Sequence, residues 1–384
     1  MKSPKIRFKG FDGDWEQRKV REVTDRYDNL RIPVAASLRV AGTTPYYGAN
    51  GIQDYVDGYT HDGEFILVAE DGANDLKNYP VKCVKGRIWV NNHAHVLQGK
   101  YDCADNQFLA YAISQADIES LLVGGGRAKL NAETLMGIDL LLPNKAEQIR
   151  IGKYLAQLDN LITLHQKKFE QLTILKKYML QKMFPQNGSD KPEIRFDGFT
   201  DDWEQRKVGD LYEVNRERNE NLIGYDKTFS IATMTYKDEG NGASEDSLKT
   251  YKVLRVGDVA FEGHTNKEFQ YGRFVLNDVG DGIMSPRFST LRPKNDMPIS
   301  FWKHYIHYEP IMRHKLVNST KAGTMMHELV ADDFFKQEIL VPSHEEQQKI
   351  GDYLNSLDHL ITLHQQKCDE LRNAKKFMLQ NMFI

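Results

Sequence analysis

The sequence of 384 residues has only three cysteines, Cys83, Cys103 and Cys368, which lie far apart and form no CxxC pair. This sparse, odd set argues against a disulfide framework and a cysteine-based zinc site, and it is typical of reduced thiols in a cytoplasm. No apolar run approaches the ~20 residues needed to span a bilayer. No apolar stretch follows the basic first residues, as it would in a signal peptide. We therefore expect a cytoplasmic protein with no membrane partner.

Familiar catalytic signatures are also missing. The sequence contains no G-x-x-x-x-G-K-[ST] phosphate loop, no H-E-x-x-H and no G-x-S-x-G. It has no Asn/Asp-Pro-Pro-Tyr stretch, by which an amino-methyltransferase holds a flipped base. His93 and His95 could share a metal on one face of a strand, but no third ligand follows at a recognisable spacing, so we predict no metal site. The sequence indicates a binding protein. A nuclease or methyltransferase active in its own right is the alternative, which methyl transfer by the purified chain would reveal.

Positive charge is not in excess, since the formal net charge is −3. By our count the segments 21–142 and 209–341 carry about −5 and −3. Binding to phosphate requires a basic surface, so any nucleic-acid contact must be a local patch, and the isolated chain should bind DNA weakly.

What the sequence has is a duplication. Residues 4–20 match residues 192–208 at 13 of 17 positions, and both segments contain DWEQRKV. Residues 143–184 match residues 342–383 at 24 of 42 positions without a gap. Residues 21–126 and 209–325, which lie between the matched segments, share almost no pattern. Such a long repeat indicates a duplicated module, because solenoid repeats are ~20–50 residues long. This layout suits one scaffold that carries two different binding surfaces.

The matched tails predict two long helices. Apolar residues recur at alternating steps of four and three, the period of a coiled-coil seam, and no proline interrupts either run. Leu161, Leu164, Leu175 and Leu180 widen the first stripe, which suggests more than one neighbour per helix. A pair of helices inside an ordinary bundle is the alternative. The predicted seam consists of Ile151, Leu155, Leu158, Ile162, His165, Phe169, Leu172, Ile350, Leu354, Leu357, Ile361, His364, Cys368 and Leu371.

The two unmatched blocks predict mixed sheet. Strands are expected at 64–72, 86–90, 253–263 and 271–280, and helices at 101–126 and 299–317. Small-residue loops with basic members come after the helices, at 124–131 and 318–329. Their backbone N–H groups could bind phosphate, although a plain helix-to-strand connection is the simpler interpretation.

Polar clusters in these blocks supply the side-chain types that contact bases and phosphates, although such clusters also occur in ordinary loops. The candidate DNA-contact residues are Tyr47, Asn50, Asn92, His93, Arg127, Lys129, His264, Lys267, Arg273, Arg287, Lys321 and Thr324.

The doubled segments "IRFKGFDGDWEQRKV" and "IRFDGFTDDWEQRKV", with the doubled tail "EQ…IG.YL..LD.LITLHQ.K", resemble the DNA specificity subunit of type I restriction–modification systems. The stretches from Tyr46 to Ala73 and from Gly257 to Pro293 are similar to target-recognition domains of that family. The resemblance spans essentially the whole chain. It implies that each block reads one half of a split, asymmetric DNA site, and that the helices fix the gap between the halves.

The resemblance also implies the architecture and partners. We expect an α+β fold, with two mixed-sheet target-recognition domains separated by two long antiparallel coiled-coil helices in a pseudo-two-fold duplication. The expected segments are 1–143 and 187–342 for the domains, and 144–186 (with a linker) and 343–384 for the helices. Two modification subunits and two restriction subunits would bind, and these partners, not this chain, would hold S-adenosylmethionine, ATP and Mg²⁺. A coiled-coil scaffold that binds only protein is the alternative.

Overall fold

The computed structural model describes residues 3–124, 128–186, 188–237, 242, 244–324 and 326–384. The chain divides into two compact units. Unit 1 comprises Met1–Gln166 and Gln365–Ile384, and unit 2 comprises Lys167–His364. Each unit is a mixed α+β body that includes the start of one long helix and the end of the other. The predicted segment boundaries follow chain order, whereas compactness divides both long helices near their middles.

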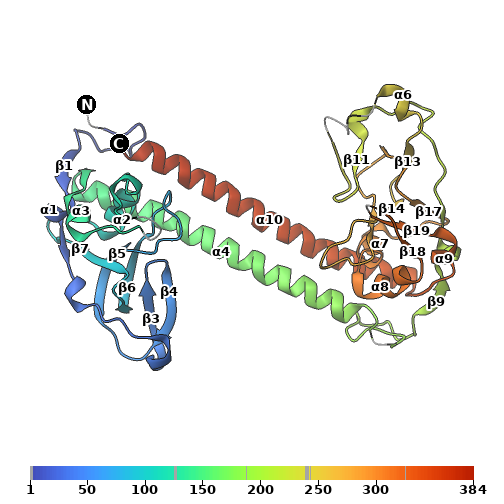
Figure 1. Ribbon diagram of the computed structural model, residues 1–384, viewed down its shortest axis with the longest axis horizontal. Helices are drawn as coiled ribbons and strands as arrows, with labels where there is room; N and C mark the ends of the chain where they lie inside the picture. Colours follow the sequence, from blue (N-terminus) through green and yellow to red (C-terminus); the bar gives the residue numbers. More distant parts are fainter. Residues whose placement is uncertain (1–2, 125–127, 187, 238–241, 243, 325) are drawn as a thin grey trace. The chain divides into compact units, whose positions relative to one another are not determined.

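Unit 1 is built on a six-stranded sheet with the strand order β2-β7-β5-β6-β3-β4, antiparallel except between β3 and β6 (Figure 1). Side chains of β5 alternate between two core clusters: Ile66 and Val68 pack on one side, and Phe65 and Leu67 on the other. Both faces of the sheet are therefore covered at this strand. The strands are β2 (Thr24–Arg26), β3 (Ala41–Gly48), β4 (Gly51–Val56), β5 (His61–Ala69), β6 (Val81–Val90) and β7 (Ala94–Gly99).

Unit 2 has a smaller four-stranded antiparallel sheet with the order β10-β17-β14-β15 and several two-stranded pairs. The strand predicted at 253–263 is wrong in one respect. It divides into β13 and β14 at Gly257, whose φ of +95° is a conformation that glycine adopts readily. The strands are β10 (Tyr212–Val214), β11 (Phe229–Ser230), β12 (Thr235–Tyr236), β13 (Lys252–Leu254), β14 (Val259–Glu262), β15 (Arg273–Leu276), β16 (Gly282–Met284) and β17 (Thr290–Pro293).

Three predicted elements differ from the structure. The helix expected at 299–317 is two helices, α7 (Ile299–Tyr305) and α8 (Glu309–Val317), because Pro310 cannot continue a helix that precedes it. In place of the helix expected at 101–126, the described residues form α2 (Asn106–Ser114), which begins where Asp105 caps the N–H of Phe108 at 2.9 Å, and a separate 3-10 helix at Glu119–Leu121. The loop expected at 318–329 contains a hairpin of β18 (Thr320–Ala322) and β19 (His327–Leu329).

The two long helices are α4 (Lys145–Met183) and α10 (His344–Met382). In each unit, the part of α4 and the part of α10 that belong to it run side by side in opposite directions (Figure 1). An ion pair joins them in both units: Lys375 to Asp159 at 2.6 Å in unit 1, and Lys176 to Asp358 at 2.5 Å in unit 2. Among the described residues, no helix is both long and apolar enough to cross a membrane.

Every residue of the predicted seam is buried or half-buried. Of the leucines that widen the first stripe, Leu161, Leu164 and Leu175 are exposed and Leu180 is half-buried. Each helix therefore leaves an apolar flank beside its seam.

Candidate nucleic-acid interface

The repeated DWEQRKV segment forms the same edge in both units. In unit 1 it forms β1 (Glu16–Lys19), which pairs antiparallel with β8 (Asp139–Leu142). In unit 2 it forms β9 (Glu204–Lys207), which pairs antiparallel with β20 (Glu338–Val341). The tryptophans before these strands, Trp15 and Trp203, are both buried. The segment thus supplies a paired strand and a buried tryptophan to each unit.

A buried ion pair anchors each of the matched segments 4–20 and 192–208, the entry segments, to a long helix. The guanidinium of Arg7 makes two bonds of 2.7 Å to the Glu147 carboxylate, and Arg195 makes bonds of 2.7 and 2.8 Å to Glu346. Both carboxylates are almost completely buried. The two pairs are related by the same sequence offsets as the duplication, 188 and 199, so the repeat is a structural one.

The last turn of each long helix contacts an entry segment. In unit 1 that segment is far from the helix end in sequence, and in unit 2 it is close. In unit 1 the backbone N–H of Ile6 donates to the carbonyl of Asn381 at 2.9 Å. In unit 2 Ile194 donates to Lys182 at the same distance. The matched segments are thus used in equivalent contacts, and the two units differ in the blocks between them. Distinct ligand recognition must therefore come from those blocks.

The candidate residues of unit 1 fall into different environments. Tyr47 is buried in the core, where burial raises the pKa of its hydroxyl. Asn50 is exposed, but its amide bonds to Gly72 and Asn74 and so organises a loop. Asn92 is exposed. His93 is half-buried, with Nδ1 2.7 Å from a carboxylate oxygen of Asp71. Arg127 lies outside the described residues.

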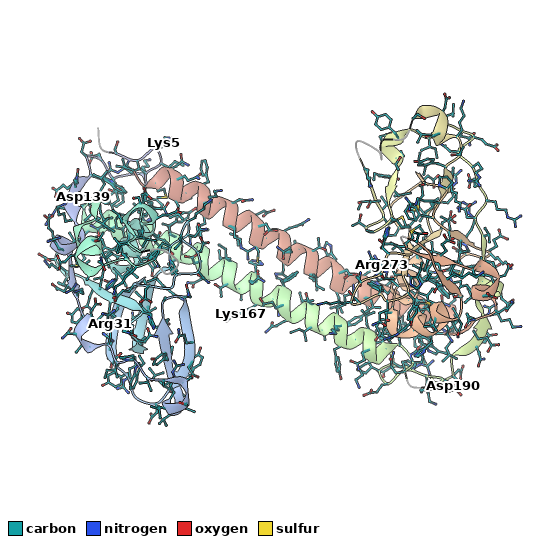
Figure 2. All side chains as sticks on the ribbon, viewed as in Figure 1. Lys5, Arg31, Asp139, Lys167, Asp190 and Arg273 are labelled. Atoms are coloured by element: carbon teal, nitrogen blue, oxygen red, sulfur yellow. The ribbon has the colours of Figure 1, made fainter. Side chains whose placement is uncertain are left out.

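Lys129 belongs to a buried charge cluster. Its ammonium lies 2.8 Å from Glu70, which also binds Arg31 at 2.6 Å; Arg31 is labelled in Figure 2. Burial raises the pKa of Glu70, but the hydrogen bonds from Lys129 and Arg31 outweigh it and the pKa is lowered. Asp28, Glu70 and His95 are close enough to hold a metal. Because Arg31 and Lys129 already supply the positive charge there, we interpret the cluster as structural. The ion pair of Lys129 with Glu70 could not be inferred from the position of Lys129 in the sequence.

The candidates of unit 2 are more exposed. His264, Lys267, Arg287, Lys321 and Thr324 are exposed.

Arg273, labelled in Figure 2, is an exception in unit 2, because its Nε donates to Glu262 at 2.7 Å. Lys321 lies in β18 opposite Glu328, so it projects from a hairpin and not from a flexible loop.

The structure adds two residues that the sequence analysis missed. The ammonium of Lys252, on β13, donates to the carbonyl of Phe288 at 2.7 Å, next to the candidate Arg287. The backbone of Arg218 pairs with that of Lys252. Arg216 and Arg218 flank an acidic residue, Glu217, and only the fold shows that Arg218 lies beside Lys252, 34 positions later.

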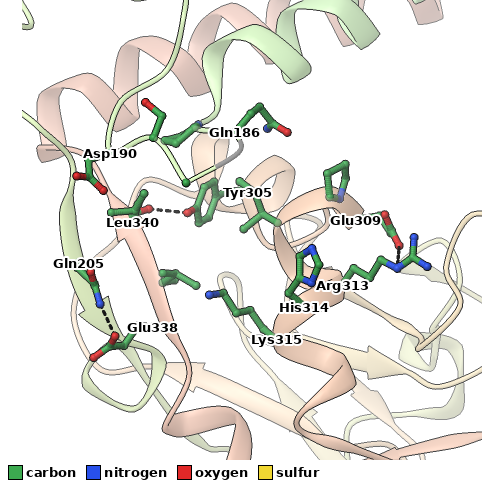
Figure 3. Close-up of a pocket in the computed structure, with 16 residues that line it drawn as sticks. Gln186, Asp190, Gln205, Tyr305, Glu309, Arg313, His314, Lys315, Glu338 and Leu340 are labelled. Carbon is green, nitrogen blue, oxygen red and sulfur yellow. Dashed lines mark hydrogen bonds and ion pairs between the residues drawn. The ribbon is translucent and has the colours of Figure 1, made fainter.

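Unit 2 also has a groove of about 740 Å³, shown in Figure 3. Arg313, His314 and Lys315 of α8 line it together with the carboxylates of Glu309 and Glu338. The hydroxyl of Tyr305 is held by the Leu340 carbonyl at 2.5 Å, and Arg313 lies 3.7 Å from Glu309. Its mixed charge gives it no preference for an anion, and no candidate DNA-contact residue is among its described lining residues.

The long helices present a repeated apolar flank. On unit 1 it consists of Leu161 and Leu164 of α4 with Phe377 of α10, and on unit 2 of Leu360 and Leu363 of α10 with Tyr178 of α4. All six side chains are exposed, and the second set is the first displaced by 199 residues. The same apolar positions are thus exposed in both units, and contiguous exposed apolar surface is typical of protein-interaction sites.

Comparison with known proteins identifies the family. The family described as "Type I restriction modification DNA specificity domain" matches residues 12–173 and again 200–373. A Haemophilus influenzae protein described as a type I restriction enzyme specificity subunit is 30% identical, over 92% of this chain and 89% of that protein. The MjaVIII specificity subunit of Methanocaldococcus jannaschii is 23% identical, over 94% and 90%.

Among solved structures, the S subunit of a type I restriction–modification system from M. genitalium has a TM-score of 0.69 at 13% identity. The match covers 100% of this chain and 99% of that one, which supports the duplicated architecture as a shared fold. With the family matched twice along its length, the chain belongs to the type I restriction–modification DNA specificity subunits, non-catalytic components that give their enzymes sequence-specific DNA recognition.

Proposed function

We propose that the blocks 21–142 and 209–341 each read one half of a split, asymmetric DNA site, while α4 and α10 fix the gap between the halves. The observation that carries this proposal is the division of labour in the fold. Repeated residues make equivalent framework contacts in both units, whereas the blocks between them form sheets of different size and strand order. One frame with two unlike surfaces suits a site with two unlike halves.

Two modification subunits dock, in this proposal, on the two copies of the apolar flank. The duplication of Leu161, Leu164 and Phe377 as Leu360, Leu363 and Tyr178 supports two equivalent partners, because equal surfaces bind equal proteins. Two restriction subunits complete the assembly in the cytoplasm. S-adenosylmethionine, ATP and Mg²⁺ are bound by these partners.

The test is a block exchange. Residues 21–142 are replaced by the equivalent block of a relative, the chain is expressed with its partners, and the methylated motif is mapped by methylation-sensitive sequencing. One half of the motif should change while the other half and the gap stay constant. A change in both halves would refute independent reading. A reciprocal exchange of 209–341 provides the matched control.

A second test addresses the gap. Four residues inserted near Leu172 lengthen the helix by about 6 Å and rotate the rest of the helix beyond the insertion by about 40°. We expect a longer gap in the methylated motif or a loss of methylation. Full activity with an unchanged gap would show that the helices do not set the distance.

The alternative, a scaffold that binds only protein, is compatible with the apolar flank but gives no role to two dissimilar blocks. It makes the opposite prediction in the block exchange: partners still assemble, and the methylated motif does not change.

A further inference from the structure

Three cations of unit 2 lie on neighbouring segments of its variable block. Lys252 lies on β13, which pairs with β16, and its Nζ donates to the Phe288 carbonyl at 2.7 Å. The backbone of Arg218 pairs with that of Lys252 from the other side. Arg287 is exposed in the turn that comes after β16, with its guanidinium 5.5 Å from the ring centroid of Phe288. Lys252 thus contacts both the segment of Arg218 and the turn that contains Arg287.

Within the described residues, none of these three cations forms an ion pair with a carboxylate. Arg218 donates to the carbonyl of Thr250 at 2.8 Å, and Lys252 to that of Phe288. Other cations of the unit are neutralised: Arg255 binds Glu217 and Asp281, and Arg292 binds Asp258. The charge of these three cations is therefore not compensated by a carboxylate within the described residues, although the net charge of the chain is −3.

The electrostatic environment of Lys252 is also unusual. Its side chain is half-buried, and burial lowers the pKa of its ammonium, with Arg218 lowering it further. Neighbouring cations and partial loss of water are unfavourable for an ammonium unless an anion approaches. A bound anion would relieve both effects.

We propose that Arg218, Lys252 and Arg287 form the backbone-binding site of unit 2 for a DNA phosphodiester. This inference rests on the proposed function and locates its second reading surface. A guanidinium can bind two phosphate oxygens at once and an ammonium acts as a point charge, so the set fits one or two adjacent phosphates. Phosphate contacts fix the position of a protein on DNA and carry no base sequence directly, so the site positions the block that reads the bases.

Two basic residues of unit 1 differ in this respect. There Lys129 and Arg31 are both held by Glu70, so their charge is already compensated. Unit 2 therefore contributes salt-dependent contacts that these two residues do not.

The experiment uses the chain assembled with its modification subunits. Binding is measured by fluorescence anisotropy between about 50 and 200 mM salt, the range over which phosphate contacts weaken strongly, on a duplex with the mapped methylation motif and on an unrelated duplex. The variants are Arg218→Ala, Lys252→Gln, Arg287→Ala and all three combined. Lys336→Ala is the matched control, because Lys336 is an exposed lysine of unit 2 that pairs with Asp333.

Each single change should weaken binding to both duplexes by a similar factor, about 3- to 10-fold, and the plot of log K against log salt should become shallower by about 1 for each phosphate that is no longer bound. The methylated motif should stay the same, and Lys336→Ala should change nothing. Because Lys252 is half-buried, Lys252→Arg serves as a second variant that keeps the charge, and it should retain most of the salt dependence.

Two results overturn the site. One is a triple variant with the wild-type salt slope in a complex that still prefers its motif. The other is a triple variant that no longer assembles with its modification subunits, which would assign the cluster to a protein partner. A wild-type complex that prefers no motif, while the variants still lower the slope, would refute the proposed function and leave the phosphate site standing.

Discussion

Removal of the Glu346 carboxylate should destabilise unit 2 strongly. In the structure it accepts two bonds from Arg195, at 2.7 and 2.8 Å, and only 1% of its side chain is exposed. Glu346→Ala leaves the guanidinium of Arg195, itself 13% exposed, without this anion. Loss of one partner of a buried ion pair costs about 3–5 kcal/mol. The entry segment should then detach from the first turn of α10.

The loss of stability caused by Glu346→Ala can be distinguished from the loss caused by breaking an exposed ion pair. Lys336→Ala removes an exposed pair with Asp333, 3.0 Å long, and should cost at most about 1 kcal/mol. The double variant Arg195→Met/Glu346→Leu should cost less than Glu346→Ala alone, because no buried charge is left unpaired. In unit 1, Glu147→Ala should match Glu346→Ala, since its pair with Arg7 has the same geometry.

Hydrogen exchange read by mass spectrometry is the suitable assay, because two units need not unfold in one transition. A loss of about 3–5 kcal/mol corresponds to exchange that is faster by about two to four orders of magnitude, in residues 192–208 for Glu346→Ala and in residues 4–20 for Glu147→Ala. The expectation is refuted if Glu346→Ala costs less than about 1 kcal/mol, the value of an exposed pair, or if the double variant is as damaging as the single one.

Three further predictions concern the helices and the chain ends. Asp159→Lys should weaken unit 1, and adding Lys375→Asp should restore part of the loss; a double-mutant cycle with no coupling would contradict a direct pair. Burial and Lys176 lower the pKa of His304 to about 4, so His304 is neutral when folded. Stability should be constant above about pH 6.5 and fall by roughly 3 kcal/mol at most as pH drops toward 4, because the unfolded state binds the proton first. In unit 1 the hydroxyl of Tyr111 donates to Asp159, which matches the Asp358 that lies 3.7 Å from His304, so His304→Tyr should flatten that dependence in acid unfolding curves. A permutant opened within 185–192, with residue 384 joined to residue 1, should fold and support methylation, since Ile6 already bonds to Asn381; an insoluble product with intact partners would count against it.

Local pattern was enough for part of the fold. The 3.5-residue period of the tails predicted both long helices, because the pattern depends only on residues three and four positions apart. A single local feature corrected the helix expected at 299–317: Pro310 ends it, and the apolar spacing on either side concealed the break. The strand expected at 253–263 failed in the same way at Gly257.

The candidate site was less predictable, because ion pairing depends on residues far away in sequence. Lys129 was expected at a phosphate, but Glu70, 59 positions earlier, binds its ammonium. Arg273 was expected at DNA, and Glu262 holds it. Conversely, Lys252 has no carboxylate partner among the described residues, a property that no spacing in the sequence expresses. Residue type therefore indicated which side chains could bind DNA, and only the fold indicated which of them are already bound within the protein.

Because the chain is duplicated, contacts made by repeated residues differ in function from contacts made by the unmatched blocks. A contact made by repeated residues, such as Arg7 with Glu147 or Arg195 with Glu346, is present in both units, so it cannot tell one half-site from the other. The compensation of charge is different in the two blocks, because Glu70 neutralises Lys129 in unit 1 while Lys252 of unit 2 donates to a carbonyl and lies near the cation of Arg218. The two reading surfaces should therefore bind the DNA backbone with unequal salt dependence. If so, a change that neutralises the cluster of unit 2 should loosen that half of the site first, while the shared frame and the gap between half-sites remain unchanged.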